Sequence, residues 1–429
     1  MRIFNESFIN ERKKRTARAL ESVLKPGDIV LVICGEPIQK PGGHDQTYPF
    51  LPHPDYMWLT GSRRPYGITA FCQEESWLDF VKPVSRDERV WEGGAEVIPG
   101  QPIDELEAWI TKKAPARVIV LGQPGKVDWR KNISEDDAHE VQEAFNEVRR
   151  IKDQAEVELI RRLASLPNAG YTQLKNYIRA GVSERQIQLE YEAAVLRAGA
   201  EKMPYDSIVG TGTNSAILHA IPTSRIVKPG ELVLIDAGAD INDYCVDITR
   251  VFPADGKFTA QQKQIYDLVM SAQTASIQLC TPGTEWVDVH KASARTIGNG
   301  LKDLGIIKGD VEEAMSLGAV AVFFPHGVGH MVGLRVRDVG GKLTKSPKVT
   351  AGARVRVDLP LQENFCMTVE PGLYFIEALI KDQETRKKFQ DQINWTEVDK
   401  WSNFGGVRIE DDILITKNGP DNLTAVVPK

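Results

Sequence analysis

The chain is 429 residues long, which is more than one typical hydrophobic core accommodates, so about two domains are expected. Hydrophobic residues make up 42% and charged residues 26% of the sequence, as in an ordinary globular protein, and this balance excludes a disordered or fibrous chain. A net charge of −6 gives no electrostatic support for nucleic acid or an anionic membrane as a partner.

The cysteines and the apolar runs bear on the cellular location. Five cysteines are scattered along the chain without a CxxC pair, so neither a disulfide framework nor a thiolate zinc site is indicated. No apolar run approaches the ~18 residues needed to cross a membrane, and no signal-peptide pattern is present. We therefore expect a reducing, cytoplasmic location and no membrane contact.

The first part of the chain alternates strand and helix patterns after an N-terminal helix, which predicts a small α/β layer domain over residues 1–150. Residues 40–61 are rich in proline, glycine and aromatic residues, and we expect a loop there, either a structured surface segment or part of a binding wall. The expected strands lie near residues 28–35, 67–72, 77–81 and 117–122, and the expected helices near 104–113 and 134–150.

A charged amphipathic helix marks the change to a second domain, which we expect to span residues 151–429. Two long helices are predicted at its start, over residues 153–180 and 183–200. Apolar residues at helical spacing then alternate with β-type runs, so the domain mixes helices and strands. The later helices are expected near 258–280 and 284–305, and the later strands near 353–359, 365–375 and 406–416.

Two aspartates, Asp236 and Asp247, interrupt apolar β-type runs in residues 232–253. The pattern predicts a hairpin whose two strands are joined by one loop, GADIND. Taken alone, each aspartate could cap a turn at a strand end. Because aspartate is disfavoured inside a strand and an unpaired buried charge is costly, the pair together requires a neutralising partner.

His326 and His330 are four positions apart in PHGVGHMVG, a spacing that places two ligands on one face of a helix. The interleaved glycines indicate a loop or a strand instead. By itself the spacing is a weak signal, since a structural role accounts for either histidine.

Glu370 and Glu410 also interrupt β-type runs, in MTVEPG and VRIEDD. With Asp236, Asp247 and a histidine they form a set of four carboxylates and one imidazole whose burial without a cation would be heavily penalised. Oxygen-rich ligation with one imidazole suits Mn, Co, Fe or Zn in a two-metal cluster better than a structural zinc site, which prefers thiolates. Two such ions can share a hydroxide that is nucleophilic near neutral pH.

In order, spacing and flanking sequence, the series Asp236, Asp247, His330, Glu370 and Glu410 resembles the ligands of the dinuclear pita-bread metallopeptidases, specifically Xaa-Pro dipeptidase (prolidase) and its relative aminopeptidase P. The likeness covers roughly residues 152–428 and is closer to prolidase in LHAIP, DITRVFPADGKFTAQQKQIY, FFPHGVGHMVGL, MTVEPGLYFI and FGGVRIEDDILIT. In the N-terminal half, YPFLPHPDYMWLTG resembles aminopeptidase P. The resemblance implies an α+β fold in which a C-terminal pita-bread (creatinase/aminopeptidase) catalytic domain follows a smaller N-terminal α/β domain.

The resemblance also implies a role for each of the five residues. Asp236 would bind one metal ion in bidentate fashion, and Asp247 would bridge two ions. His330 and Glu370 would bind the second ion, with Glu410 as the other bridge. Glu370 would carry a proton from the bridging water to the leaving proline nitrogen. The implied cofactors are two divalent ions, Mn first, with Co, Zn or Fe as alternatives.

Further matching residues would surround the substrate. His219 and His326 match the family's histidines beside the scissile carbonyl, where they could stabilise the developing oxyanion. Arg408 matches an arginine that orients the ligand carboxylates, and Thr249 would support the cluster through a hydrogen bond. Arg356 aligns with the prolidase arginine that holds the substrate's C-terminal carboxylate.

One position departs from the family pattern. The family usually reads GLxVHDVG, with a histidine that contacts substrate, whereas this chain reads GLRVRDVG with Arg337 in its place. Either the position tolerates neutral change, or a fixed positive charge alters substrate choice, turnover or pH profile, because arginine does not exchange protons near neutral pH. If the segment is a strand, Arg335 lies on the same face, and the two could recognise a carboxylate or face solvent.

The leading hypothesis is therefore a two-metal hydrolase that cleaves the bond before proline in short peptides, dipeptides first. The alternatives are an Xaa-Pro aminopeptidase acting on longer peptides, and a catalytically weakened peptide-binding homologue in which Arg337 marks the loss of activity. Metal-free creatinase-like chemistry is disfavoured by the five intact ligands. The resemblance also implies a homodimer, with residues 48–58 as a candidate for closing the partner's site.

Overall fold

The computed structural model describes residues 4–43, 45–91, 93, 99–123, 125, 127–341 and 348–429. The chain divides into two compact units, Met1–Arg149 and Arg150–Lys429. No helix within the described ranges combines the length and the apolar composition that a membrane span requires.

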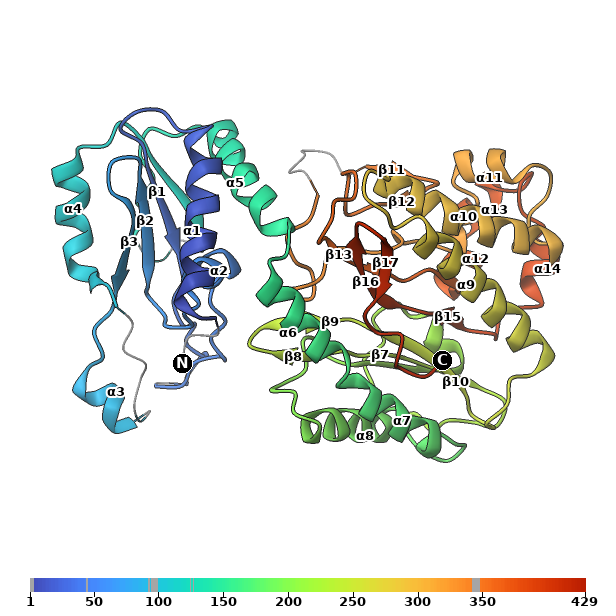
Figure 1. Cartoon of the computed structure of the whole chain (residues 1–429). Helices are drawn as coiled ribbons and strands as arrows, with labels where there is room; N and C mark the ends of the chain where they lie inside the picture. The colour runs from blue at the N-terminus through green and yellow to red at the C-terminus, as the bar shows by residue number, and fades with distance from the viewer. Residues whose placement is uncertain are drawn as a thin grey trace. The chain divides into compact units, whose positions relative to one another are not determined.

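The first unit is built on a mixed sheet with strand order β4-β3-β2-β1-β5 (Figure 1). Strand β1 pairs antiparallel with β2 and parallel with β5. Every residue of β1 and β2 is buried, which explains the unbroken apolar character of these strands. The elements of this unit are α1 (Glu6–Glu21), β1 (Ile29–Ile33), α2 (Pro54–Thr60), β2 (Ile68–Cys72), β3 (Ser76–Val81), α3 (Arg86–Trp91), β4 (Gln101–Pro102), α4 (Leu106–Lys113), β5 (Val118–Gly122) and α5 (Glu135–Arg150).

The loop expected over residues 40–61 is only partly a loop, because its second half forms the helix α2. Pro54 opens this helix, where its missing N–H costs nothing, and the ring of His53 accepts a hydrogen bond from the backbone N–H of Asp55. The side chain of Trp58 is buried within the first unit, whereas that of Tyr48 is half exposed. The aromatic residues of the segment therefore divide between the core and the surface.

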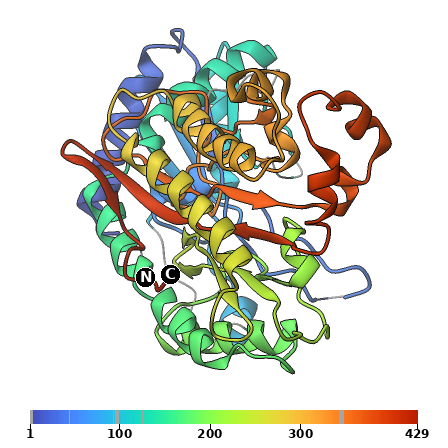
Figure 2. The same cartoon turned by 90° about the vertical axis from the view of Figure 1, so that its right-hand side faces the viewer.

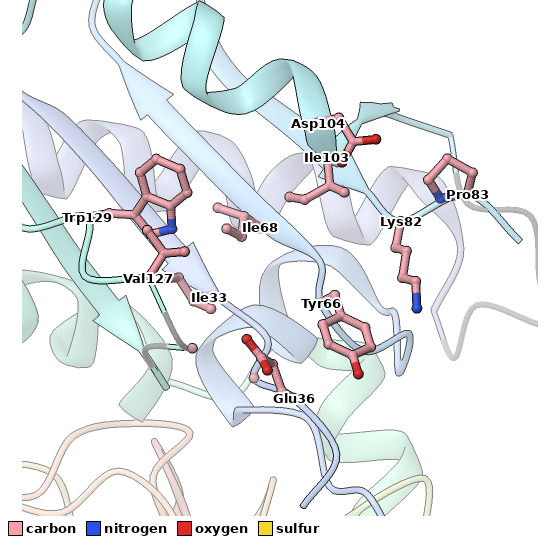
Figure 3. A pocket seen from close by; sticks show the side chains of 12 residues that line it. Ile33, Glu36, Tyr66, Ile68, Lys82, Pro83, Ile103, Asp104, Val127 and Trp129 are labelled. Atoms are coloured by element: carbon pink, nitrogen blue, oxygen red, sulfur yellow. The ribbon is translucent and has the colours of Figure 1, made fainter. Parts of the chain in front are cut away.

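A cavity of about 480 Å³ borders the sheet of the first unit (Figure 3). Ile33 and Ile68 lie between Trp129 on one side and Lys82 on the other, and Tyr66 lies near Lys82. The described residues that line this cavity include none of the site residues expected from the sequence.

The second unit contains the remaining helices, of which α7 packs against α8 and α9 against α10 (Figures 1 and 2). The single helix expected over residues 153–180 is broken at Pro167, which cannot donate a backbone hydrogen bond and opens α7 instead. The helices are α6 (Gln154–Ala164), α7 (Pro167–Tyr177), α8 (Glu184–Arg197), α9 (Ala260–Gln278), α10 (Trp286–Asp303), α11 (Val311–Leu317), α12 (Glu377–Ile380), α13 (Gln383–Lys388) and α14 (Trp395–Asp399).

The strands of the second unit are short and pair mainly antiparallel, with orders β10-β7-β6, β13-β16-β17, β14-β15 and β8-β9. Helix α8 packs on β6, and α9 packs on β13, β14, β15 and β17. The strands are β6 (Ile208–Thr211), β7 (Leu232–Asp236), β8 (Ala239–Ile241), β9 (Tyr244–Val246), β10 (Thr249–Pro253), β11 (Val349–Thr350), β12 (Ala353–Arg354), β13 (Cys366–Val369), β14 (Gly372–Tyr374), β15 (Gly406–Arg408), β16 (Asp411–Thr416) and β17 (Gly419–Asn422).

The hairpin expected over residues 232–253 exists, but the loop expected over GADIND, residues 238–243, is only partly a loop. Its first part contains strand β8, and the turn lies at its end, at Asn242 and Asp243, whose φ angles are 56° and 65°. Two successive residues with positive φ are the mark of a type I′ hairpin turn, which asparagine and aspartate tolerate. The hairpin is therefore longer than expected, with β7 paired to β10 and β8 paired to β9.

Candidate metal centre and active site

Backbone pairing brings three of the expected ligands together. Asp236 is the last residue of β7 and pairs with Thr249 in β10, so the short connection that carries Asp247 lies beside it. The backbone N–H of Glu410 donates to the carbonyl oxygen of Thr249 at 3.1 Å, which places the segment between β15 and β16 against β10. Three carboxylates that are far apart in the sequence thus lie on neighbouring backbone segments.

The other two expected ligands come from the loop that carries the histidines and from the end of β13. The N–H of Thr368 donates to the carbonyl of His330, and the N–H of Glu370 donates to the carbonyl of Val328, both at 2.8 Å. Between them, a Cβ at Gly329 would lie 2.0 Å from the Thr368 carbonyl oxygen. The glycine is needed for this close approach, so the segment is irregular rather than helical, as its glycine content indicated.

The five side chains converge on one small cavity. Ligand atoms of Asp247, His330 and Glu410 lie within 4.8 Å of one another. Nε2 of His330 is 3.5 Å from Oδ2 of Asp247 and 3.7 Å from Oε1 of Glu370. The cavity measures about 110 Å³ and is lined by every site residue expected from the sequence: His219, Asp236, Asp247, His326, His330, Arg337, Arg356, Glu370, Arg408 and Glu410.

Tyr205 is a member of this site that the sequence did not reveal. Its hydroxyl hydrogen-bonds to Oδ1 of Asp236 at 2.7 Å and also to Oδ1 of Asp247. Burial raises the pKa of Tyr205 well above its ordinary value, so the phenol stays protonated and remains a donor. The residue lies in an irregular segment before β6, where no spacing or motif distinguishes it from a structural tyrosine.

Arg408 is buried and uses its whole guanidinium group inside the site. Nη2 donates to Oδ2 of Asp236 at 2.5 Å, Nε donates to the hydroxyl of Thr249 at 3.1 Å, and Nη1 donates to the hydroxyl of Tyr374 at 3.0 Å. The Thr249 hydroxyl in turn donates to Oε2 of Glu410 at 2.6 Å. The arginine therefore orients ligands from two segments at once, and Tyr374 is a second site residue that the sequence analysis missed.

Both ring nitrogens of His326 are engaged by neighbouring groups. Nδ1 is 2.9 Å from the carbonyl oxygen of Gly327, which only accepts, so Nδ1 carries the proton. Nε2 then accepts from the hydroxyl of Tyr374 at 2.9 Å. Burial, together with the charge of Arg408, lowers the pKa of His326 to about 3. In this geometry His326 is neutral and accepts a hydrogen bond from Tyr374. His219, by contrast, forms no hydrogen bond within the part of the chain that the structure describes.

The carboxylates of the site repel one another, and this repulsion changes their pKa values. Burial raises the pKa of Asp236 to about 7, opposed by Arg408 and reinforced by the nearby charge of Asp247. Burial and the charges of Asp247, Glu370 and Asp236 raise the pKa of Glu410 well above its ordinary value. Three of the four carboxylates are buried and Glu370 is partly buried, and Arg408 is the one arginine among the described residues that forms an ion pair with any of them. Bound cations would relieve the repulsion that remains between these carboxylates.

The donor set also fits divalent metal ions. Nδ1 of His330 lies 2.9 Å from the carbonyl oxygen of Met331 and must donate to it, which leaves the lone pair of Nε2 facing Asp247 and Glu370. Carboxylate oxygens with one imidazole suit Mn, Co, Fe or Zn, and no cysteine lines the described cavity. The residues present therefore fit the metal centre expected from the sequence.

The three arginines expected near the substrate lie in different environments in the structure. Arg335 adopts φ 107° and pairs with Asp243 at 3.5 Å, so it is anchored away from the cavity. Arg337 and Arg356 line the cavity, are exposed, and form no ion pair with any residue that the structure describes. The shared role considered for Arg335 and Arg337 is thus excluded, because only one of them faces the site.

Antiparallel strands that bring four carboxylates and one imidazole to a single cavity are the arrangement of a pita-bread metallohydrolase. Residues 158–417 match the model of metallopeptidase family M24, and residues 9–97 match that of the aminopeptidase P N-terminal domain. The chain therefore belongs to metallopeptidase family M24 and is an enzyme of the metallopeptidase class.

Individual proteins are similar to this chain in sequence or in structure over nearly its whole length. A probable Xaa-Pro aminopeptidase of Botryotinia fuckeliana is 32% identical over 90% of this chain and 86% of its own. Proline aminopeptidase P II from Yersinia pestis has a TM-score of 0.79 and 26% identity over 99% of this chain and 97% of its own. A zinc-substituted Escherichia coli aminopeptidase P in complex with product has a TM-score of 0.76 and 26% identity, covering 98% and 96%. These likenesses confirm the α+β architecture with a separate N-terminal domain.

Proposed function

We propose that this chain hydrolyses the peptide bond that precedes proline and releases the N-terminal residue of Xaa-Pro peptides. The observation that carries the proposal is the convergence of Asp236, Asp247, His330, Glu370 and Glu410 on one buried cavity. The family membership supports it, since the relatives named above are aminopeptidases of this specificity.

The same five residues would hold two divalent metal ions, with Mn as the proposed metal. When bound, the ions would lower the pKa of a water molecule and polarise the scissile carbonyl. Asp247, His330 and Glu410 would be ligands of the same centre, and ligand atoms of these three residues within 4.8 Å of one another support a shared site. Asp236 accepts a hydrogen bond from Tyr205, and Oε1 of Glu370 lies 3.7 Å from Nε2 of His330.

The remaining roles follow from what each side chain already contacts. Burial raises the pKa of Glu370 despite the opposing charges of His330 and Arg408, which suits a carboxylate that takes a proton and passes it to the leaving proline nitrogen. His219 lines the cavity with a ring that is free of other hydrogen bonds among the described residues, so we assign it the carbonyl oxygen. Arg408 positions the ligands rather than the substrate.

Longer peptides are favoured over dipeptides as substrates. The small cavity adjoins one of about 490 Å³, with which it shares His326 and His330, and one of about 640 Å³, with which it shares His219 and Asp236. This additional space next to the centre suits a chain that continues beyond proline. A dipeptidase is the second candidate, because Arg356 lines the cavity, forms no ion pair with any described residue, and could hold the carboxylate of a dipeptide.

A comparison of Ala-Pro-Ala with Ala-Pro as substrates distinguishes the aminopeptidase from the dipeptidase. The purified protein is analysed for metal content, loaded with Mn, and assayed for released alanine. Hydrolysis of the tripeptide supports the aminopeptidase, and hydrolysis of the dipeptide alone supports the dipeptidase. Full occupancy by two metal ions with no hydrolysis of either peptide would contradict the proposal and favour a peptide-binding homologue.

A further inference from the structure

Three arginines, Arg337, Arg354 and Arg356, line the cavity of about 490 Å³ beside the metal-type centre. We refer to it as the arginine cavity. His326 and His330 line both this cavity and the smaller one that holds the carboxylates, so the two spaces adjoin. A ligand bound at the centre can therefore extend into the arginine cavity.

The sequence explains why two of these arginines face the same way. In residues 353–358, ARVRVD, the side chains of Val355 and Val357 are buried while Arg354 and Arg356 are exposed. Alternate residues of an extended segment share a face, so the two arginines and Asp358 point to the cavity side. This extended segment lies beside the one that carries Arg337, because a Cβ at Gly341 would be 2.5 Å from the backbone nitrogen of Asp358.

The carboxylates that line the arginine cavity are already paired with lysines. Lys152 contacts Asp338 at 2.7 Å, and Lys348 contacts Asp358 at 2.5 Å. None of the three arginines forms an ion pair or a side-chain hydrogen bond with another residue that the structure describes. Residues 342–347 contain no Asp or Glu in the sequence, so that segment supplies no acidic partner. The cavity thus presents guanidinium groups without a matching negative charge.

The second cavity that adjoins the centre carries both acidic and basic side chains. The space of about 640 Å³ is lined by Asp206, Asp236 and Asp247 as well as by Arg185 and Arg337. A peptide carries a positive charge at its amino end and a negative charge at its carboxyl end. The excess of guanidinium groups therefore places the negatively charged carboxyl end, the part of the peptide after proline, in the arginine cavity.

From this arrangement we propose that the arginine cavity selects peptides with an acidic residue directly after proline. The proposal rests on the proposed function and specifies its substrate class. Arg356 and Arg337 would bind the C-terminal carboxylate of a tripeptide. Arg354 would bind the acidic side chain of the residue that follows proline. Guanidinium groups suit this role because they bind carboxylates through two parallel N–H donors.

The test compares Ala-Pro-Glu-amide with Ala-Pro-Gln-amide and Ala-Pro-Lys-amide on the metal-loaded full chain. The amides remove the terminal carboxylate, so only the side-chain charge differs. At low salt we expect kcat/KM for the Glu peptide to exceed that for the Gln peptide about fivefold, with the Lys peptide lowest. At 0.5 M NaCl the ratio should shrink toward one, since salt screens exposed charges. Equal kcat/KM values at low salt would overturn the proposal.

Charge variants locate the effect. Arg354→Gln is expected to bring the Glu-to-Gln ratio close to one, and Arg354→Glu to favour the Lys peptide. Arg179→Gln, at an exposed arginine elsewhere in the same unit, should keep the wild-type ratio. An unchanged ratio in Arg354→Glu would contradict the assignment.

A binding measurement separates this proposal from the proposed function. Calorimetric titration with the product-type dipeptides Pro-Glu and Pro-Gln should show tighter binding of Pro-Glu, whether or not hydrolysis occurs. Hydrolysis of all three amides at equal rates, with equal binding of the two dipeptides, would refute the acidic preference and leave the proposed function standing. Absence of hydrolysis with preferential Pro-Glu binding would refute the proposed function alone.

Discussion

The hydroxyl of Tyr205 lies 2.7 Å from Oδ1 of Asp236 and also hydrogen-bonds to Asp247, so a single phenol joins two of the proposed ligands. The two aspartates come from β7 and from the connection before β10, and Tyr205 comes from the segment before β6. The tyrosine acts on the centre through the carboxylates that it holds.

Tyr205→Phe is expected to weaken metal binding about 10- to 100-fold while leaving the fold intact, because it removes a hydrogen bond that orients two ligands without changing their charge. Competition with a chelator measures the change in affinity. Tyr177→Phe, at a partly exposed tyrosine of α7, serves as the control and should bind metal as the wild type does. Equal affinities in the two variants would show that the Tyr205 hydroxyl has no orienting role.

Glu370→Gln is expected to reduce kcat on Ala-Pro-Ala about 10²- to 10⁴-fold, since the amide keeps an oxygen donor but does not transfer the proton. Elemental analysis should find most of the metal retained. Glu363→Gln, at an exposed glutamate earlier in the same segment, is the matched control and should keep full activity. Substantial turnover in Glu370→Gln would refute the proton-transfer role.

Arg337→His is expected to change the pH dependence of kcat/KM. The wild-type guanidinium stays charged at all working pH values, whereas an imidazole gains or loses its proton near pH 6.5 or somewhat below it, given the neighbouring positive charge of Arg356. The profile of Arg337→His should therefore show an additional change of kcat/KM with pH on the acid side. Arg337→Lys keeps the charge and should retain the wild-type shape. Superimposable pH profiles for all three proteins would show that the exchange of histidine for arginine at position 337 is functionally neutral.

His290 makes the stability of the second unit depend on pH. Burial lowers the pKa of this histidine to about 4, although its contact with the Thr350 carbonyl opposes the shift. The unfolded chain, with a histidine pKa of about 6.5, therefore binds a proton at pH values where the folded chain does not. The contribution to the free energy of unfolding is full above about pH 6.5 and falls as the pH drops toward 4.

Urea unfolding at pH 7 and pH 5 checks this expectation. The loss of unfolding free energy between the two pH values should be about 2 kcal/mol smaller in His290→Gln than in the wild type. His139→Gln, at an exposed histidine, is the control. An identical loss in His290→Gln and the wild type would mean that the folded protein protonates His290 as readily as the unfolded chain does.

Helices and strands with strong local patterns were predicted well from the sequence. The helix expected near 258–280 is α9, Ala260–Gln278, and the strand expected near 28–35 is β1, Ile29–Ile33. The errors lie where one residue overrides a pattern. Pro167 ends a continuous helical periodicity, and the loop that composition indicated over residues 238–243 is reduced to a turn at Asn242 and Asp243, because strand β8 takes up its first part. Turn geometry depends on backbone angles that composition only partly determines.

The sequence by itself determined which side chains could form a metal centre, because carboxylates and a histidine that interrupt apolar strands are recognisable from their immediate neighbours. Only the tertiary structure decided which charges are neutralised and which remain available. Arg335 and Arg337 are two positions apart, yet Asp243 anchors the first while the second faces the cavity without an ion pair among the described residues. Tyr205 likewise became part of the site only through folding. Pairing of charges and hydrogen bonds depends on distances in space between segments far apart in the chain, and local patterns carry no information about those distances.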